Sequence, residues 1–436
     1  MSLEDRFAEL VKQLGISRAH VAGGYAADAV TLARAFPDWI ASMTLVCPFR
    51  PPPEPFQPLG DRLLFIHGDR GPGAASVPGA RRGLPDSRAL LLTDYEDAAW
   101  SDAIADRRDE IAATLLPFLD EQSRRNGLDR LDVPAADGEI AGIAYRVRGS
   151  GPPLVLLPLT LARSQWDPLI PLLAEHYTTV VLSGANLGII PSLEQRMRGG
   201  YRGVVRAVVD AAAAQAGEQV VEIGCGSGAV ARWLARHLPD NPVAAVDVNG
   251  YLLREAAALT RADGLADRIT FHEGNAEELP FPDESFDLTF SFTVMEEVNA
   301  ARMLAELVRV TRPTGRIGVV VRATDMRPWV NLPLEPELMR AVQSVPGAGA
   351  AELGCSDASL YQRFRDAGLQ PILLGPQLAP ERADRSPDRL RLFAGRIAQA
   401  LEADDSRTFR TAVRQAVENG SMLWAEPYHC AVATKP

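Results

Sequence analysis

Three glycines alternate with other residues in the segment 224–228 (Gly-Cys-Gly-Ser-Gly), directly after the apolar run Val220–Ile223. A backbone without side chains can come close to a ligand. Val230, Trp233 and Leu234 follow at helical spacing, and the start of such a helix offers free N–H groups and a positive dipole end. The segment therefore predicts a ligand-binding turn between a buried strand and a helix.

The turn by itself is compatible with two other interpretations. Gly224, Gly226 and Ala229 also fit the dinucleotide fingerprint with a small last residue, which would indicate NAD binding. A tight turn in an α/β fold could equally carry no ligand. Features later in the chain have to decide between these interpretations.

Three such features follow in order. The strand-like run Val243–Val246 ends in Asp247, where α/β folds place a carboxylate on ribose hydroxyls. Residues 274–282 (Gly-Asn-Ala-Glu-Glu-Leu-Pro-Phe-Pro) precede Ser285–Leu288, and residues 312–320 form a turn that leads into another strand.

Together these motifs resemble the class I S-adenosylmethionine-dependent methyltransferases, in particular their small-molecule branch related to the ubiquinone and menaquinone type. The resemblance covers roughly residues 200–436. It implies a Rossmann-like, seven-stranded α/β domain over residues 196–436 that uses S-adenosyl-L-methionine. By this resemblance the cofactor would contact Glu222, Gly224, Cys225, Gly226 and Gly228 with its methionine part, Asp247 with its ribose, Val248, Asn275 and Ala276 with its adenine, and Phe292, Thr293 and Val294 at the floor of the site.

One residue departs from the family pattern. The family usually has aspartate where Asn275 stands, and asparagine keeps the acceptor oxygen but loses the charge. We expect cofactor binding to survive this change in a weaker form.

The acceptor side of the site is less marked. Glu296 is a candidate general base, although a carboxylate that starts a helix would need no catalytic role. Tyr201 is a candidate for a segment that closes over the cofactor. We expect methyl transfer to oxygen, carbon or nitrogen of a small organic molecule, without a metal, because no metal-ligand spacing is visible. The alternatives are a non-catalytic binding or assembly protein and an NAD-dependent oxidoreductase.

The first half of the chain predicts a second α/β domain over residues 1–195. Residues 1–121 resemble the second half of an α/β-hydrolase, and residues 140–195 resemble the first half, with residues 122–139 as a linker. The halves could complete one permuted sheet or remain two fragments. The nucleophile turn has Tyr25 in place of serine, and neither the acid nor the histidine stands where the triad needs it. We expect a degenerate scaffold that binds, caps or forms a homodimer; the alternative is a surviving esterase that uses Tyr25 or Asp28.

Composition narrows the class of protein. The 436 residues are 47% hydrophobic and 23% charged, with a formal net charge of -11, which argues against a nucleic-acid surface. The four cysteines show no C-x-x-C spacing, and neither a signal peptide nor a membrane-spanning run is visible. We therefore expect a cytoplasmic protein whose partner is a small-molecule substrate rather than nucleic acid or membrane.

Overall fold

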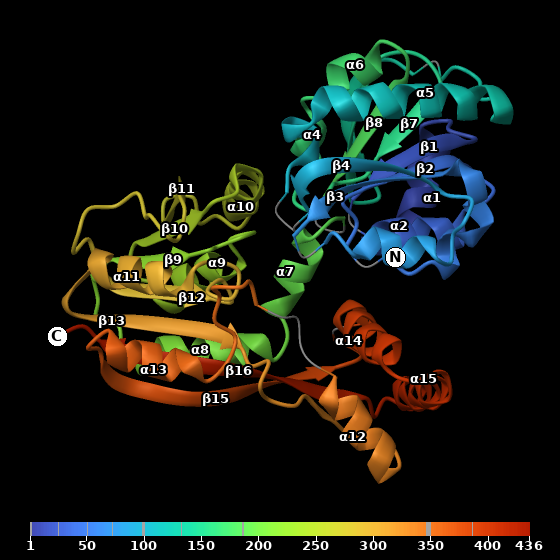
Figure 1. Ribbon diagram of the computed structural model, residues 1–436. Helices are drawn as coiled ribbons and strands as arrows, with labels where there is room; N and C mark the ends of the chain where they lie inside the picture. The colour runs from blue at the N-terminus through green and yellow to red at the C-terminus, as the bar shows by residue number, and fades with distance from the viewer. Residues whose placement is uncertain are drawn as a thin grey trace. The chain divides into compact units, whose positions relative to one another are not determined.

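The computed structural model describes residues 2–24, 26–49, 51–71, 73–97, 101–131, 133–184, 187–345, 350–385 and 387–436. The chain separates into two compact units, Met1–Pro191 and Ser192–Pro436 (Figure 1). Each unit contains one eight-stranded sheet. The predicted boundary after residue 195 falls just inside the second unit, within helix α7 (Ile190–Arg196).

The sheet of the first unit has the order β4-β3-β2-β1-β7-β8-β6-β5. Its strands are β1 (Ala19–Gly23), β2 (Ile40–Val46), β3 (Leu63–Arg70), β4 (Arg88–Glu96), β5 (Ala136–Ile140), β6 (Ile143–Arg148), β7 (Pro153–Leu156) and β8 (Thr178–Ser183). Strand β1 pairs in parallel with both β2 and β7, so the two blocks of sequence complete a single sheet. Within the described part of this sheet, β6 runs antiparallel to both β5 and β8, and the other strand pairs are parallel.

The predicted linker at residues 122–139 contains regular structure at both of its ends. Helix α5 (Arg108–Asn126) continues into it, and β5 occupies its end. The polar side chains in the last turns of α5 form hydrogen bonds within the protein. Gln122 is buried and donates to the Asp61 carbonyl, and Asn126 donates to the Gln122 carbonyl. Because these buried residues are polar, the sequence shows no apolar periodicity here, and the end of the helix could not be predicted from it.

The other helices of the first unit are α1 (Leu3–Gln13), α2 (Ala26–Ala35), α3 (Ser76–Arg81), α4 (Ala103–Asp106) and α6 (Ile170–Ala174), with 3-10 turns at Glu54–Arg62 and Arg163–Trp166. Tyr25 lies outside the described residues. Asp28 is buried and accepts the N–H of Gly188 at 2.7 Å, which is a structural use of its carboxylate. The resemblance of this unit to hydrolases stays a prediction.

The sheet of the second unit has the order β11-β10-β9-β12-β13-β16-β14, and β15 pairs with β16. Its strands are β9 (Val220–Ile223), β10 (Val243–Asp247), β11 (Ile269–Glu273), β12 (Phe286–Phe292), β13 (Thr311–Arg322), β14 (Trp329–Val330), β15 (Gln370–Arg382) and β16 (Leu423–Thr434). Strands β9 to β13 are parallel, and β16 runs antiparallel to β13 and β15. The Rossmann-like α/β class is confirmed, and the two-residue β14 adds an eighth strand to the predicted seven.

The last strand of the chain, β16, lies inside the sheet although it contains a proline. Pro427 pairs with Leu378, and its carbonyl accepts the Ala323 N–H. The true edge is β15, which carries Pro371, Pro376 and Pro380. Strand β15 continues to Arg382.

Helices cover both faces of this sheet, and a smaller helical group has a core of its own. Helices α8 (Tyr201–Ala211), α9 (Ala229–His237) and α10 (Gly250–Ala262) share one core with the strands, and α11 (Ala300–Val310) and α13 (Ser359–Asp366) share another. Helices α12 (Pro336–Ser344), α14 (Pro387–Ala400) and α15 (Ala403–Glu418) pack around Trp424. Within the described ranges, no helix is long and apolar enough to cross a membrane.

Candidate cofactor and acceptor site

The glycine turn joins β9 to α9 at the carboxyl ends of the parallel strands. Gly224, Gly226 and Gly228 have φ angles of +77°, +53° and +71°, which favour glycine strongly. The N–H groups of Gly224 and Cys225 donate to the Val246 carbonyl at 2.7 and 2.9 Å. The turn is therefore bent tightly back onto the neighbouring strand.

Asp247 holds this turn from the end of β10. Its Oδ2 accepts the Gly226 N–H at 2.7 Å, and its Oδ1 accepts the Asn249 N–H at 2.9 Å. Burial raises the pKa of Asp247, and the two N–H donors oppose that effect. Each oxygen keeps acceptor capacity, so the carboxylate could also accept hydroxyl groups of a ligand.

Glu222 is the buried acid of this site. Its side chain is 2% exposed, and within the described part of the chain its Oε2 has no hydrogen-bond partner. Burial and, secondly, the negative charge of Asp247 raise its pKa well above the usual range. A cation beside Glu222 would offset both effects, since it would supply the missing partner and the missing charge.

Cys225, close to Glu222 in the chain, is a buried thiol rather than a thiolate. Burial comes first and the Glu222 charge second among the causes that raise its pKa far above the ordinary value. Only its backbone is suited to ligand contact here.

The remaining predicted cofactor residues lie at the same edge of the sheet. Phe292 ends β12, Thr293 follows with a φ of +61°, and a Cγ atom of Val294 would lie 2.1 Å from a Cβ placed on Gly224. The Gly274 N–H donates to the Asp247 carbonyl, which brings the next residues, Asn275 and Ala276, to this edge. The structure therefore brings these segments together.

Two residues of the expected adenine side differ in exposure. Ala276 is 8% exposed, whereas Val248 is 62% exposed and offers an apolar surface to solvent or to a ligand. The Asn275 side-chain oxygen accepts the Glu277 N–H at 2.8 Å, so part of its acceptor capacity serves the local turn.

Helix α7 also contacts the glycine turn, and no motif of the sequence predicted this contact. A Cδ atom of Leu193 would lie 3.3 Å from a Cβ placed on Gly226. Glu194 accepts the Ser227 hydroxyl at 2.7 Å and pairs with the buried Arg232 at 2.5 Å. Glu194 and Arg232 are far apart in the sequence, so no local pattern predicts that they pair. The available signal is Arg232 itself, a charged residue on the buried side of α9 that needs an acidic partner.

The candidate base Glu296 lies in the loop after β12. It is 1% exposed, and its Oε1 accepts the Arg322 N–H at 3.1 Å and an Arg322 guanidinium N–H at 3.2 Å. Its Oε2 has no partner in the part of the chain that the structure describes. Burial raises the pKa of Glu296, while the Arg322 charge opposes this rise.

The second acceptor-side candidate, Tyr201, begins α8 and is 2% exposed. Its ring lies 5.2 Å from the Tyr428 ring and 4.1 Å from the Arg196 guanidinium carbon. Its hydroxyl lies 3.5 Å from the Thr293 hydroxyl, to which Arg196 also donates. Burial raises the pKa of Tyr201 to about 12, so Tyr201 is a neutral donor at physiological pH.

The segment that builds this site is similar to known proteins. Residues 221–319 match the methyltransferase domain family. Methyltransferase GfsG of Streptomyces halstedii is 36% identical over 113 residues, which are 25% of this chain and 40% of that protein. The ubiquinone/menaquinone biosynthesis C-methyltransferase UbiE of Vibrio campbellii is 32% identical over 117 residues, 26% of this chain and 45% of that protein. The chain thus spans less than half the length of these two relatives.

Solved structures are similar to about half of the chain. The cyclase SpnF is 21% identical, with 54% of this chain and 80% of that chain covered and a TM-score of 0.36. The geranyl diphosphate C-methyltransferase of Streptomyces coelicolor is 15% identical, with 53% and 78% covered and a TM-score of 0.33.

Proposed function

We propose, from the methyltransferase domain that this chain carries in its C-terminal unit, that the protein transfers a methyl group from S-adenosyl-L-methionine to a small organic acceptor. The observation that carries the proposal is the buried Glu222 carboxylate oxygen, which has no partner among the described residues, beside the glycine turn and Asp247. An ammonium or sulfonium ligand would supply what this carboxylate lacks.

The residues present fit this ligand. Glu222 would bind the ammonium group of the methionine part. The turn 224–228, which has no side chains at its three glycines, would leave room for the other atoms of that part. Asp247 would accept the ribose hydroxyls while it holds Gly226 and Asn249. When bound, S-adenosyl-L-methionine supplies a methyl group on a positively charged sulfur, so that attack by a nucleophile neutralises charge.

The protein's own contribution is positioning and the handling of one proton. Holding donor and acceptor in line, with water excluded, supplies much of the rate of such a transfer. The Glu296 Oε2, which no described residue contacts by a hydrogen bond, would accept the proton of a hydroxyl or carbon acid, with Arg322 fixing the other oxygen. Its raised pKa makes Glu296 a stronger base than an exposed glutamate.

The proposal is tested by titration calorimetry of the full chain with S-adenosyl-L-methionine and, separately, with NAD. We expect saturable binding of the first and none of the second. Transfer of a radiolabelled methyl group to a panel of phenols and carboxylic acids then tests turnover. NAD binding, or no binding of either ligand, would overturn the proposal; binding without transfer to any acceptor would favour the non-catalytic alternative.

The role of Glu296 is tested by Glu296→Gln, which keeps the shape and an acceptor for Arg322. With the best acceptor of the panel, we expect turnover to fall by about 100-fold or more, because the variant cannot take up the proton. Donor affinity should stay unchanged. Glu297→Gln is the matched control, since Glu297 also lies near Arg322, at 3.6 Å, but is far more exposed. Equal turnover in the two variants would leave Glu296 without a catalytic role.

For the first unit we propose a scaffold role, which includes a homodimer formed through it. The single sheet that its two sequence blocks build supports a folded scaffold. We further propose a small-molecule substrate as the partner of the second unit, in line with the acidic net charge of -11.

A further inference from the structure

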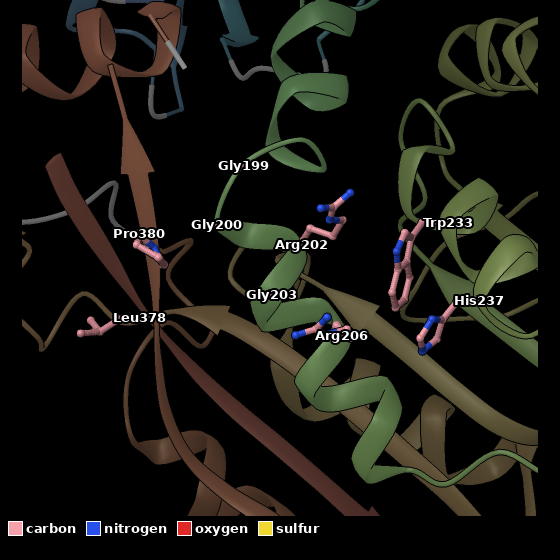
Figure 2. Close-up of a pocket in the computed structure, with 9 residues that line it drawn as sticks. All are labelled: Gly199, Gly200, Arg202, Gly203, Arg206, Trp233, His237, Leu378 and Pro380. Carbon is pink, nitrogen blue, oxygen red and sulfur yellow. The ribbon is translucent and has the colours of Figure 1, made fainter. Parts of the chain in front are cut away.

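A hollow of the C-terminal unit lies beside the exposed side of helix α8, and neither Glu222 nor the glycine turn lines it. This cavity has a volume of about 440 Å³ and is lined by Arg202, Gly203 and Arg206 of α8, Trp233 and His237 of α9, and Pro380 of β15. In Figure 2, Arg202 and Arg206 lie on α8, and Trp233 and His237 lie on the neighbouring helix to their right. A smaller adjoining hollow shares Arg202 and Pro380 with it and adds Arg198 and Arg385.

Much of the positive charge of this region is unpaired. Among the described residues, the guanidinium groups of Arg198, Arg202 and Arg206 have neither a hydrogen-bond nor an ion-pair partner, while Arg385 acts on Asp384 through its charge. A protein with a net charge of -11 offers many carboxylates to pair with surface arginines. Three arginines without a partner in the described chain, with Arg385 beside them, therefore favour an anion from outside the chain.

The carboxylates nearby are already engaged. Asp210 bonds His237 at 2.8 Å, and the buried Glu381, which also lines the smaller hollow, lies 3.5 Å from Arg389. Arg382 also lines the smaller hollow, but it forms an ion pair with Asp384 at 2.9 Å. The electrostatic balance of the hollow is thus positive.

Two adjacent glycines shape this region. A Cβ on Gly200 would lie 2.1 Å from the Pro380 carbonyl oxygen, and a Cβ on Gly199 would lie 2.3 Å from a Glu381 carboxylate oxygen. Only a turn without side chains can lie so close to β15. This close approach places Arg198, which directly precedes the pair, and Arg202, two residues after it, beside the hollows.

One wall of the cavity is aromatic and apolar. The Trp233 and His237 rings are stacked, with centroids 4.4 Å apart, and Leu378 is 52% exposed. Guanidinium groups bind phosphate oxygens in a fork geometry, and an indole suits a flat ring. We propose that the cavity binds a small aromatic phosphomonoester, with its phosphate on Arg202 and Arg206 and its ring against Trp233.

This site is separate from the proposed donor site. Tyr201 contacts Tyr428 and Thr293 on the buried side of α8, whereas Arg202, Gly203 and Arg206 are exposed on the outer side. Binding here can therefore be measured independently of S-adenosyl-L-methionine.

The test is titration calorimetry of the full chain with 1-naphthyl phosphate. We expect saturable binding that weakens as salt is raised, with weaker binding of inorganic phosphate, which lacks the ring, and of 1-naphthol, which lacks the charge. Arg206→Ala should weaken binding by about 10-fold, the loss of one charge-assisted contact. Arg261→Ala, an exposed arginine of α10, is the control and should change nothing.

The sharpest comparison uses Gly203, where an added Cβ would meet no atom within 4 Å. Gly203→Glu and Gly203→Gln have the same shape, and both should keep α8 helical. We expect the glutamate variant to bind 1-naphthyl phosphate at least about 10-fold more weakly than the glutamine variant, because its charge opposes the phosphate. Wild-type affinity in Arg206→Ala or in both Gly203 variants, or no saturable binding by the unmodified chain, would overturn the proposal. Loss of S-adenosyl-L-methionine binding would bear only on the proposed methyl transfer.

Discussion

Replacing Asp247 by alanine is expected to weaken S-adenosyl-L-methionine binding by about 30- to 100-fold, or about 2–3 kcal/mol. The carboxylate accepts the Gly226 and Asn249 N–H groups and would also accept the ribose hydroxyls. Hydrogen bonds to a charged group contribute about 1.5–3 kcal/mol each, and the free Gly226 N–H would also have to find another partner. Titration calorimetry with the donor and with S-adenosylhomocysteine measures the loss.

Asp287→Ala is the matched control for this experiment. Asp287 also accepts a backbone N–H, from Gln219 at 2.8 Å, and pairs with Arg312. It stands at the start of β12, however, so its loss should reduce stability without changing donor affinity. Wild-type affinity in the Asp247 variant, or an equal loss in both variants, would contradict the ribose role of Asp247.

Gly224→Ala should abolish measurable donor binding and lower the melting temperature of the C-terminal unit. Alanine at a φ of +77° costs about 1 kcal/mol, and its Cβ would lie 2.1 Å from a Val294 methyl carbon. Overpacking of this kind costs a further 1–3 kcal/mol or so, because Val294 or the turn has to move. Calorimetric titration and thermal unfolding followed by circular dichroism check the two effects.

Two further variants separate backbone strain from steric overlap. Gly217 has a φ of +84°, but a Cβ there would meet no atom within 4 Å, so Gly217→Ala reports the backbone cost alone. In Gly224→Ala combined with Val294→Ala, the overlap is relieved and stability should return to about that of Gly217→Ala. Donor binding by Gly224→Ala at wild-type strength would remove the glycine turn from the proposed site.

The features of the site that were predictable are local in sequence. The alternating glycines and the acid that ends the next strand form short patterns, because a tight turn restricts residue type at fixed spacings. The structure places Gly226 and Asp247 within hydrogen-bond distance, as the pattern requires. The contact of Glu194 with Ser227 and Arg232 has no such pattern. It joins two segments whose distance in the sequence is not fixed by the geometry of a turn.

The fold was predictable where burial is uniform and less so where polar residues are satisfied internally. Strands such as β2, buried along its whole length, are recognisable from composition. The end of α5 was missed because Gln122 is polar and buried at once. The joining of the two sequence blocks in the first unit depends on the pairing of β1 with β7, a non-local contact that residue spacing does not encode.

The prolines of β15 have a consequence for self-association. An exposed strand edge is a template on which another chain can add a strand, and this edge is 13 residues long. Pro371, Pro376 and Pro380 carry no N–H, so an incoming strand would find gaps in the row of donors along its whole length. The three prolines therefore disfavour amyloid-like growth from this edge of the sheet. Replacing them with residues that carry an N–H should make the edge a better template for strand addition.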